Sequence, residues 1–199
     1  MTAPAELLDR YAQFDALVFD LDGTLADTMP AHYASWSVVA GRHGLSFPEA
    51  TFYSWGGRPS LGIVQDLAEQ QGVALDHAAV AMEKEAHYLE HGAGQSQPIE
   101  PVLAIARAFR GRKPLAIGTG GRRRQAEPIL AALAITDWFD AIVTADDVTE
   151  HKPHPATYLL AAERIAVAPE RCVVFEDTDL GLDAGRAAGM TAVDIRGLI

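Results

Sequence analysis

The sequence predicts an α/β fold in which a doubly wound parallel sheet forms the core and a small all-helical cap is inserted after the first strand. Two observations predict it. Apolar runs of strand length alternate with helical patterns in the second half of the chain, whereas the stretch after the first apolar run contains helical patterns alone. The chain therefore combines one sheet-containing core with one helical insert.

Five apolar runs have the length and composition of buried parallel strands. They cover residues 16–19, 115–118, 141–144, 172–175 and 192–195. Helical patterns separate the last four runs, and such alternation places helices on both faces of a parallel sheet. We expect residues 1–28 and 97–199 to form this doubly wound, Rossmann-like core.

Residues 29–96 interrupt the alternation and are predicted to form the cap domain. Helical patterns cover residues 30–44, 59–72 and 76–92, with no strand pattern between them. Asp27 or Thr28 can cap the first of these helices, with Pro30 in its first turn. The hinges are expected just after Thr28 and in the glycine-rich segment 92–98.

Composition limits the partners of the chain. A formal net charge of -11 argues against a nucleic-acid surface, which needs a broad basic stripe. No window approaches the roughly 18 apolar residues of a membrane span, and the N-terminus lacks the apolar core of a targeting signal. The single cysteine, Cys172, lies in the apolar run CVVF and is expected to be a small buried hydrophobic residue. We expect a cytoplasmic protein without nucleic-acid or membrane partners, monomeric by default.

Polar and charged residues follow four of the predicted strands at the point where each strand ends. Parallel strands bring their carboxyl ends to one rim of the sheet, where the ligands of open α/β sheets bind. The residues in question are Asp20, Asp22, Gly23 and Thr24, then Thr119, Gly120 and Gly121, then Asp146, Asp147 and Lys152, and finally Glu176, Asp177 and Asp179. Carboxylates, a hydroxyl and a lysine should therefore converge on this rim.

Such a group of side chains suits phosphate chemistry. Carboxylates brought together repel one another, and burial raises their pKa values unless a cation compensates. Their oxygens suit Mg²⁺, which is typically held by one or two carboxylates together with substrate phosphate. Thr119 and the amides of Gly120 and Gly121 at a helix start can bind phosphate oxygens, and Lys152 adds a positive charge. The combination is typical of phosphoryl transfer.

Four segments carry a resemblance to a known family. They are DLDGTLADT from Asp20, IGTGG around Thr119, KPHPATYLLAAERI from Lys152 and VVFEDTDLGLDAGRAAGM from Val173. In this order they resemble the four motifs of the haloacid dehalogenase superfamily of aspartyl-phosphate phosphotransferases, over nearly the whole chain. The resemblance implies that the helical cap closes over the site and selects the substrate.

The resemblance also implies a role for each matching residue. Asp20 would be the nucleophile that forms an aspartyl-phosphate, and Asp22 would be the general acid and then the general base. Thr119 and Lys152 would hold the transferring phosphoryl group. The ligands of Mg²⁺ would be the Asp20 carboxylate, the Asp22 backbone carbonyl, Asp177, and Glu176 either directly or through water. Dehalogenating members lack the second aspartate, so Asp22 argues against dehalogenation.

At finer grain the chain resembles the β-phosphoglucomutase-like subgroup, and most of all bacterial phosphatases of fructose 1-phosphate and 6-phosphogluconate. The similar segments include YAQFDALVFDLDGTLADTMPAH, WFDAIVTADDVTEHKPHPATYLLAAERI and CVVFEDTDLGLDAGRAAGM. We therefore expect a Mg²⁺-dependent sugar phosphatase, a phosphoric monoester hydrolase. An intramolecular phosphosugar mutase is the alternative. A catalytically silent binding relative is a third hypothesis, for which the intact motifs offer little.

Two residues of the insert are candidates for the substrate site. His32 occupies the place where sugar-phosphate members of the family have a histidine near the acid/base aspartate. Arg58, in the loop GGRPS, has a guanidinium suited to bidentate recognition of phosphate or sugar oxygens. An exposed loop residue without such a role is the alternative for Arg58. For Trp36, four residues after His32, we expect a packing role.

Charged residues at two predicted helix starts have structural explanations as well. Arg122 to Arg124 oppose the helix dipole, and either an ordinary exposed surface or an anionic substrate accounts for them. Asp179 and Asp183 are expected to be solvated, because a helix start favours acidic residues. The arginine run and the GGRPS loop match neither sugar phosphatases nor mutases, which leaves the identity of the sugar open.

Overall fold

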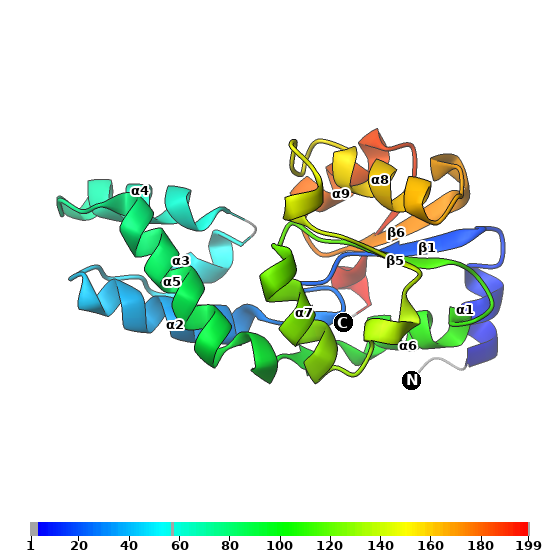
Figure 1. Ribbon diagram of the computed structural model, residues 1–199, viewed down its shortest axis with the longest axis horizontal. Helices are drawn as coiled ribbons and strands as arrows, with labels where there is room; N and C mark the ends of the chain where they lie inside the picture. The colour runs from blue at the N-terminus through cyan, green and yellow to red at the C-terminus, as the bar shows by residue number, and fades with distance from the viewer. Residues whose placement is uncertain (1–3, 57, 199) are drawn as a thin grey trace. The chain divides into compact units, whose positions relative to one another are not determined.

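The computed structural model describes residues 4–56 and 58–198, which form two compact units (Figure 1). The core contains the chain up to Asp27 and again from Gln97, and the cap is Thr28–Ser96. Residues 1–3 and 199 of the predicted core, and Gly57 of the predicted substrate loop GGRPS, lie outside the described residues. The cap is thus a single insertion into the core.

A five-stranded parallel sheet lies at the centre of the core, in the order β5-β4-β1-β6-β7. Its strands are β1 (Ala16–Phe19), β4 (Leu115–Gly118), β5 (Ala141–Val143), β6 (Cys172–Glu176) and β7 (Thr191–Asp194). The register aligns Phe19 of β1 with Ile117 on one side and with Phe175 on the other. The predicted α/β class is confirmed, and each strand lies within one residue of its predicted bounds.

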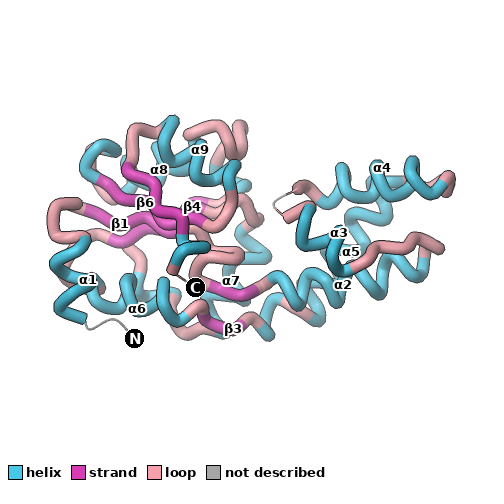
Figure 2. Tube along the Cα trace, turned by 180° about the vertical axis from the view of Figure 1, so that it is seen from behind, coloured by secondary structure: helices cyan, strands magenta, loops and turns pink. Residues whose placement is uncertain are grey.

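Helices cover both faces of this sheet. Figures 1 and 2 show α8 (Ala156–Arg164) and α9 (Asp179–Ala187) on one face. They show α1 (Pro4–Arg10) and α6 (Glu100–Phe109), which contact each other, on the opposite face. The inner strands β4, β1 and β6 are therefore buried from both sides, which explains their apolar runs, whereas the edge strand β7 is partly exposed.

Side chains alternate between these two faces along each strand. Val174 of β6 belongs to the buried cluster that contains residues of α8 and α9, as does Cys172, which is fully buried as predicted. Phe175 points the other way, where the ring of Tyr11 meets it edge-on with the ring centroids 5.1 Å apart. Glu176, two residues after Val174, consequently faces α8 and α9.

The connectivity reverses at β1. From β1 the chain reaches β4 and then β5, returns past β1 to β6, and continues outward to β7. Open α/β sheets bind their ligands at such a reversal, outside the carboxyl ends of the strands. The core also contains α7 (Arg123–Ala132) and the 3-10 turns η2 (Thr136–Trp138), η3 (Ala145–Asp147), η4 (Pro169–Arg171) and η5 (Ile195–Gly197).

The two chain segments at the boundary of the core pair with each other. β2 (Ala26–Asp27) and β3 (Gln97–Pro98) form a short antiparallel ribbon. The glycine-rich segment 92–98, expected to be a linker, therefore ends in a strand and contains the 3-10 turn η1 (Ala93–Gln95). Strands of two residues have no periodicity to predict, and their pairing depends on the rest of the core.

The described residues of the cap contain helices joined by loops, and no strand. Its helices are α2 (Met29–Arg42), α3 (Glu49–Ser54), α4 (Ser60–Gln71) and α5 (His77–His91). They enclose a core that includes Trp36, Phe47 and Phe52, so Trp36 has the packing role expected for it. The sequence did not predict α3, because six residues are too few to show a helical period. No helix in the described ranges is both long enough and apolar enough to cross a bilayer.

Thr28 occupies the N-cap position of α2, but its side chain makes no capping hydrogen bond. The prediction that Asp27 or Thr28 N-caps this helix is therefore confirmed in position for Thr28, although its side chain does not provide the capping hydrogen bond. Thr28 has helical backbone angles, which are unsuited to capping, and its hydroxyl is buried without a hydrogen-bond partner in the described part of the chain. α5, by contrast, is capped by Asp76, whose carboxylate accepts from the Ala79 N–H at 3.0 Å.

Candidate active site

Asp20 stands directly after β1, in the middle of the sheet. Its backbone N–H donates to the Phe175 carbonyl at 3.0 Å, which extends the pairing of β1 with β6 by one residue. The side chain is 5% exposed, and its Oδ1 accepts a hydrogen bond from Lys152 Nζ at 2.6 Å. The buried strand thus presents a carboxylate at the rim with a cation beside it.

Gly23 forms the tight turn that follows Asp22. Its φ of +82° is a left-handed conformation that favours glycine. A Cβ at this position would lie 2.3 Å from Asp177 Oδ2. The same turn brings Thr24 to Asp177, whose Oδ1 accepts from the Thr24 hydroxyl at 2.9 Å. The glycine of the DLDGT segment therefore allows Asp177 to approach the end of β1.

Asp22 is directed toward the end of β4. Its Oδ2 accepts a hydrogen bond from the Thr119 hydroxyl at 3.3 Å, and the Thr119 oxygen in turn accepts from the Gly121 N–H at 2.9 Å. Thr119 is almost completely buried. Asp20 and Asp22, two residues apart, thus accept hydrogen bonds from different residues. The two carboxylates therefore lie in different chemical environments.

Lys152 joins Asp20 to the last residue of β6. Its Nζ lies 2.6 Å from Asp20 Oδ1 and 2.7 Å from Glu176 Oε1. Burial would lower the pKa of Lys152, but the Asp20 carboxylate, together with Tyr158 and Glu176, outweighs burial and raises the pKa well above its ordinary value. Lys152 therefore remains a fixed positive charge.

Asp20, Glu176 and Asp177 form a carboxylate cluster, in which one oxygen from each residue lies within 4.8 Å of the others. Burial raises the pKa of Asp20 well above its ordinary value, and Lys152 offsets only part of this effect. Burial, with repulsion from Glu176, raises the pKa of Asp177 to about 6. A divalent cation would remove the repulsion, and an all-oxygen donor set fits Mg²⁺.

The core residues predicted for catalysis, phosphate binding and metal binding lie together at the carboxyl ends of β1, β4 and β6 and in the loop before α8. They are Asp20, Asp22, Thr119, Gly120, Lys152, Glu176 and Asp177. Acidic residues predicted to have solvated roles lie apart from them: Asp179 and Asp183 are exposed and paired with Arg196 and Arg186.

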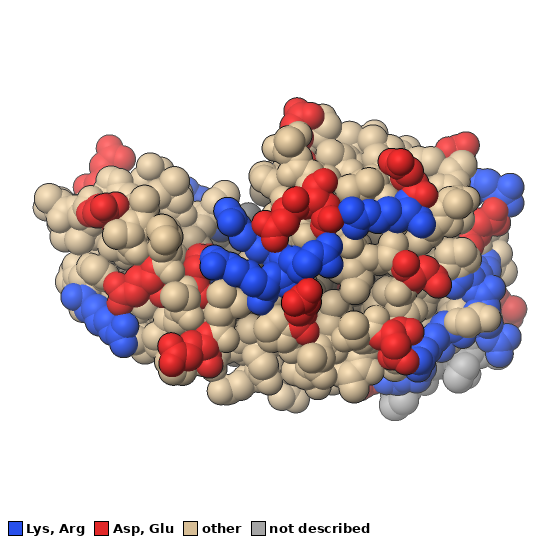
Figure 3. Space-filling model, viewed as in Figure 1, with Lys and Arg blue, Asp and Glu red and all other residues tan. Residues whose placement is uncertain are grey.

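The positive charge of the arginine run at the start of α7 is partly compensated within the core. The Arg123 guanidinium lies 3.0 Å from Asp147, and its backbone N–H donates to Asp146 at 2.9 Å. Arg122 and Arg124 are exposed. Figure 3 shows basic side chains gathered beside acidic ones over α7. Asp146 and Asp147 thus have a structural role. They neutralise part of the positive charge of the arginine run, for which an anionic substrate was one predicted explanation.

In the cap, His32 lies against α5. Its Nδ1 is 2.8 Å from Lys84 Nζ, and its ring stacks on the Tyr88 ring with the centroids 3.7 Å apart. A protonated Lys84 would donate to Nδ1 and so leave the His32 ring proton on Nε2. Arg58, the other cap candidate, pairs with Asp66 and covers the Trp55 ring at 4.5 Å.

Two residues of these sites were not predicted from the sequence. Tyr158 of α8 donates its hydroxyl to Glu176 Oε1 at 2.9 Å. Lys84 of α5 is buried, at 3% exposure. One signal could have revealed Lys84: it lies four residues after Val80 and four before Tyr88, which places a charge on the buried face of the helix. Tyr158 has no such signal, because a tyrosine on an apolar face is usual.

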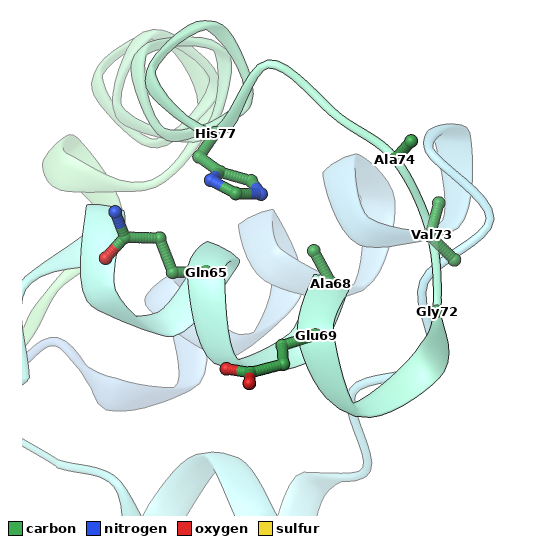
Figure 4. Close-up of a pocket in the computed structure, with 7 residues that line it drawn as sticks. All are labelled: Gln65, Ala68, Glu69, Gly72, Val73, Ala74 and His77. Atoms are coloured by element: carbon green, nitrogen blue, oxygen red, sulfur yellow. The ribbon is translucent and has the colours of Figure 1, made fainter.

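A surface hollow of about 470 Å³ lies elsewhere on the cap, between the end of α4 and the start of α5 (Figure 4). Its lining includes Gln65, Glu69 and His77. None of the residues predicted for catalysis or binding is among the residues that line it.

Comparison with known proteins decides the family. The family model of the haloacid dehalogenase-like hydrolases matches residues 14–189. The chain belongs to this family. It is 41% identical over 186 residues to the fructose-1-phosphate phosphatase YqaB of Escherichia coli, and the match covers 94% of this chain and 98% of the relative. It is 29% identical to the phosphorylated carbohydrates phosphatase of Thermotoga maritima, over 90% of this chain and 83% of the relative. This haloacid dehalogenase-like hydrolase is a phosphoric monoester hydrolase.

Solved structures of other family members share the fold. A β-phosphoglucomutase from Clostridium difficile has a TM-score of 0.75 at 25% identity, and the match covers 91% of this chain and 84% of that one. A putative β-phosphoglucomutase from Thermotoga maritima has a TM-score of 0.72 at 29% identity, with 88% and 82% covered. The resemblance inferred from the motifs is therefore confirmed at the level of the family and its β-phosphoglucomutase-like members.

Proposed function

We propose that this haloacid dehalogenase-like hydrolase cleaves small sugar phosphates, of the fructose 1-phosphate or 6-phosphogluconate type, through an aspartyl-phosphate on Asp20. One observation carries the proposal: the Asp20 carboxylate, at the end of the central strand, has Lys152 at 2.6 Å and the other carboxylates of the cluster within 4.8 Å. The relative at 41% identity, which acts on fructose 1-phosphate by its name, supports the sugar.

The first half-reaction uses both aspartates. The Asp20 carboxylate oxygen attacks phosphorus, and the bond between phosphorus and the sugar oxygen breaks. Asp22 donates a proton to the departing oxygen, which leaves as the sugar hydroxyl. Lys152 and the Thr119 hydroxyl bind the phosphoryl oxygens, so that their charge is stabilised during the transfer. The products of this step are the free sugar and phosphorylated Asp20.

The second half-reaction restores the enzyme. Asp22, now ionised, takes a proton from a water molecule, whose oxygen attacks phosphorus. The bond between phosphorus and the Asp20 oxygen breaks, and inorganic phosphate leaves. The separate partners of the two carboxylates, Lys152 for Asp20 and Thr119 for Asp22, match this division of work.

The carboxylate cluster is the proposed magnesium site. Asp20, Asp177, the Asp22 backbone carbonyl, and Glu176 directly or through water would hold the ion. Mg²⁺ bound there would offset the negative charge of the carboxylates and of the substrate phosphate. In the cap, His32 and Arg58 are proposed to contact the sugar or a second phosphate. Arg58 must then exchange its pairing with Asp66 for the substrate.

A panel of sugar phosphates tests the proposal. Phosphate release is measured for fructose 1-phosphate, 6-phosphogluconate and other hexose and pentose phosphates, with Mg²⁺ and with EDTA. We expect release that requires Mg²⁺ and that Asp20→Asn abolishes. Absence of release from every sugar phosphate by the native chain, or undiminished release by Asp20→Asn, would refute the proposal.

The structural similarity to β-phosphoglucomutases, at TM-scores of 0.75 and 0.72, favours a second candidate. A mutase must keep the phosphoryl group on Asp20 until the sugar has turned over and accepted it at a different oxygen. β-Glucose 1-phosphate distinguishes the two functions. A mutase converts it to glucose 6-phosphate faster than free phosphate appears, whereas a phosphatase releases phosphate without that product.

A further inference from the structure

Tyr158 lies beneath the active-site rim, on the face of the sheet covered by α8 and α9. It is fully buried, and its hydroxyl donates to Glu176 Oε1 at 2.9 Å. Lys152 Nζ lies 4.8 Å from the centre of its ring. Tyr158 therefore contacts both the carboxylate that binds Lys152 and Lys152 itself, although it is not at the rim.

The ring of Tyr158 is fixed by close packing against β4. A Cβ on Gly118 would lie 2.9 Å from both Cδ1 and Cε1 of the ring, nearer than side-chain carbons approach each other. Gly118 therefore gives the ring the space it occupies. Because the backbone of β4 forms one wall of this space, the Tyr158 hydroxyl has a defined position with respect to Glu176.

Glu176 is held at both of its oxygens. Oε1 accepts from Lys152 at 2.7 Å and from Tyr158 at 2.9 Å, and Oε2 accepts from the backbone N–H and the hydroxyl of Thr178, each at 2.9 Å. An ionised carboxylate has about four acceptor positions, and these four contacts restrict the rotation of the Glu176 carboxylate. On the other side of Glu176, a Cβ on Gly181 would lie 1.7 Å from Oε1. Glu176 is thus locked in one orientation.

We propose that Tyr158 is a positioning residue of the active site, which acts through Glu176 to hold Lys152 beside Asp20. Two donors share Glu176 Oε1, and their directions fix the oxygen. The oxygen in turn fixes Lys152 Nζ at 2.6 Å from the nucleophilic carboxylate. Asp20, which Lys152 contacts, is also a proposed ligand of Mg²⁺, so the same contacts would affect metal binding. The inference rests on the proposed function where it is tested by kcat and KM. The test by Mg²⁺ affinity does not depend on that function.

Tyr158→Phe removes the hydroxyl and keeps the ring. Its matched control is Tyr11→Phe: Tyr11 is also buried, it packs on Phe175 next to Glu176 but on the opposite face of β6, and its hydroxyl has no hydrogen-bond partner in the described part of the chain. Each variant is titrated with Mg²⁺ alone by calorimetry. Each is also assayed for kcat and KM with p-nitrophenyl phosphate, and circular dichroism checks the fold.

For Tyr158→Phe we expect Mg²⁺ affinity and kcat to fall by about tenfold, as is typical when a partner of a metal-ligating group is lost. KM and the circular dichroism spectrum should not change, and Tyr11→Phe should match the wild type throughout. In a Glu176→Gln background, Tyr158→Phe should cause no further loss, because its effect passes through Glu176.

Wild-type Mg²⁺ affinity and kcat in Tyr158→Phe, equal losses in Tyr158→Phe and Tyr11→Phe, or losses that add to those of Glu176→Gln would each overturn the inference. A native chain that hydrolyses no phosphate ester would refute the proposed function instead. The Mg²⁺ titrations would then still decide whether Tyr158 positions Glu176.

Discussion

The ammonium nitrogen of Lys152 lies 2.6 Å from the carboxylate of Asp20, although 132 residues separate the two along the chain. The parallel sheet makes this contact possible, because it brings the end of β1 next to the end of β6, whose Glu176 also binds Lys152. Burial raises the pKa of Asp20, and Lys152 opposes that rise. Lys152 therefore stabilises the charge of the proposed nucleophile, and we propose that it also stabilises the charge of the phosphoryl group.

Lys152→Met is expected to lower kcat/KM by about 10²- to 10³-fold, the loss typical of removing one donor to a developing negative charge. The measurement is phosphate release at saturating Mg²⁺. Lys113→Met is the matched control, since it removes the same charge before β4, where Lys113 donates to the Ala12 carbonyl at 2.8 Å. Lys113→Met should retain wild-type kcat/KM. Similar losses in the two variants would show that the effect of Lys152 is not specific to the site.

Mg²⁺ is expected to raise the melting temperature of the metal-free protein, because it relieves the repulsion within the carboxylate cluster. Binding at a hundredfold excess over Kd stabilises a folded state by about 2.7 kcal/mol. Asp177→Asn removes a proposed ligand and should lose most of this stabilisation. Asp183→Asn makes the same charge change at an exposed residue paired with Arg186, and should keep it. The melting temperatures are measured in EDTA and in Mg²⁺. A wild-type protein whose melting temperature does not rise with Mg²⁺ would contradict the proposed metal site.

Gly181→Ala is expected to impair the site more than the fold. The new Cβ would lie 1.7 Å from Glu176 Oε1, so the carboxylate must leave its partners Lys152 and Tyr158. We expect kcat to fall by about 10- to 100-fold, the range for a displaced metal-site partner. Gly62→Ala is the control: it is also in a helix, nothing lies within 4 Å of its Cβ position, and it should stabilise the protein by about 0.5–1 kcal/mol. Full activity in Gly181→Ala would contradict the expectation.

The sequence predicted the sheet and the rim because both depend on neighbouring residues. A strand buried on both faces is a short apolar run, and the residues after it lie at the rim whatever the rest of the chain does. The Asp20 and Asp177 positions follow from this rule. α3 and the β2–β3 ribbon do not, because elements of six and two residues are stabilised by what packs against them and have no pattern of their own.

Tyr158 and Lys84 show what such rules miss. Their partners, Glu176 and His32, are 18 and 52 residues away, and only the folded chain brings them together. A buried tyrosine usually fills space, so its hydrogen bond to Glu176 was not predictable from its place on α8. The roles of the rim residues in catalysis remain predictions for the same reason: they depend on a substrate whose identity the contacts within the chain do not specify.

Asp147 is expected to give the core a stability that depends on pH. Burial would raise the pKa of Asp147, but hydrogen bonds from Arg164 and Thr144 outweigh burial and hold it well below its ordinary value. A lowered pKa means that the stabilisation is complete above the unfolded-state value of about 4 and is lost as the pH falls below it. Asp147→Asn should therefore lower the melting temperature at pH 6, and the difference from wild type should shrink toward pH 3. A difference that does not change with pH would contradict this account.

Lys84→Met is expected to affect sugar phosphates selectively. Lys84 is buried beside His32 and lies 5.5 Å from the centre of the Trp36 ring, so methionine can fill its space while the hydrogen bond to His32 Nδ1 is lost. If His32 contacts the sugar, its ring must be held in one orientation with the proton on Nε2. We expect kcat/KM for the best sugar phosphate to fall by about tenfold, equivalent to one lost hydrogen bond to a charged group.

Hydrolysis of p-nitrophenyl phosphate, which has no sugar hydroxyls, should not change in Lys84→Met. Arg42→Met is the matched control, because Arg42 is an exposed cation of the cap that pairs with Glu83, and its loss should affect neither substrate. Nitrogen NMR of the histidine rings should show the Nε2-protonated form of His32 in the wild type and a mixture of forms in Lys84→Met. Equal losses for the sugar phosphate and the aryl phosphate would mean that Lys84 supports the fold of the cap and not the choice of substrate.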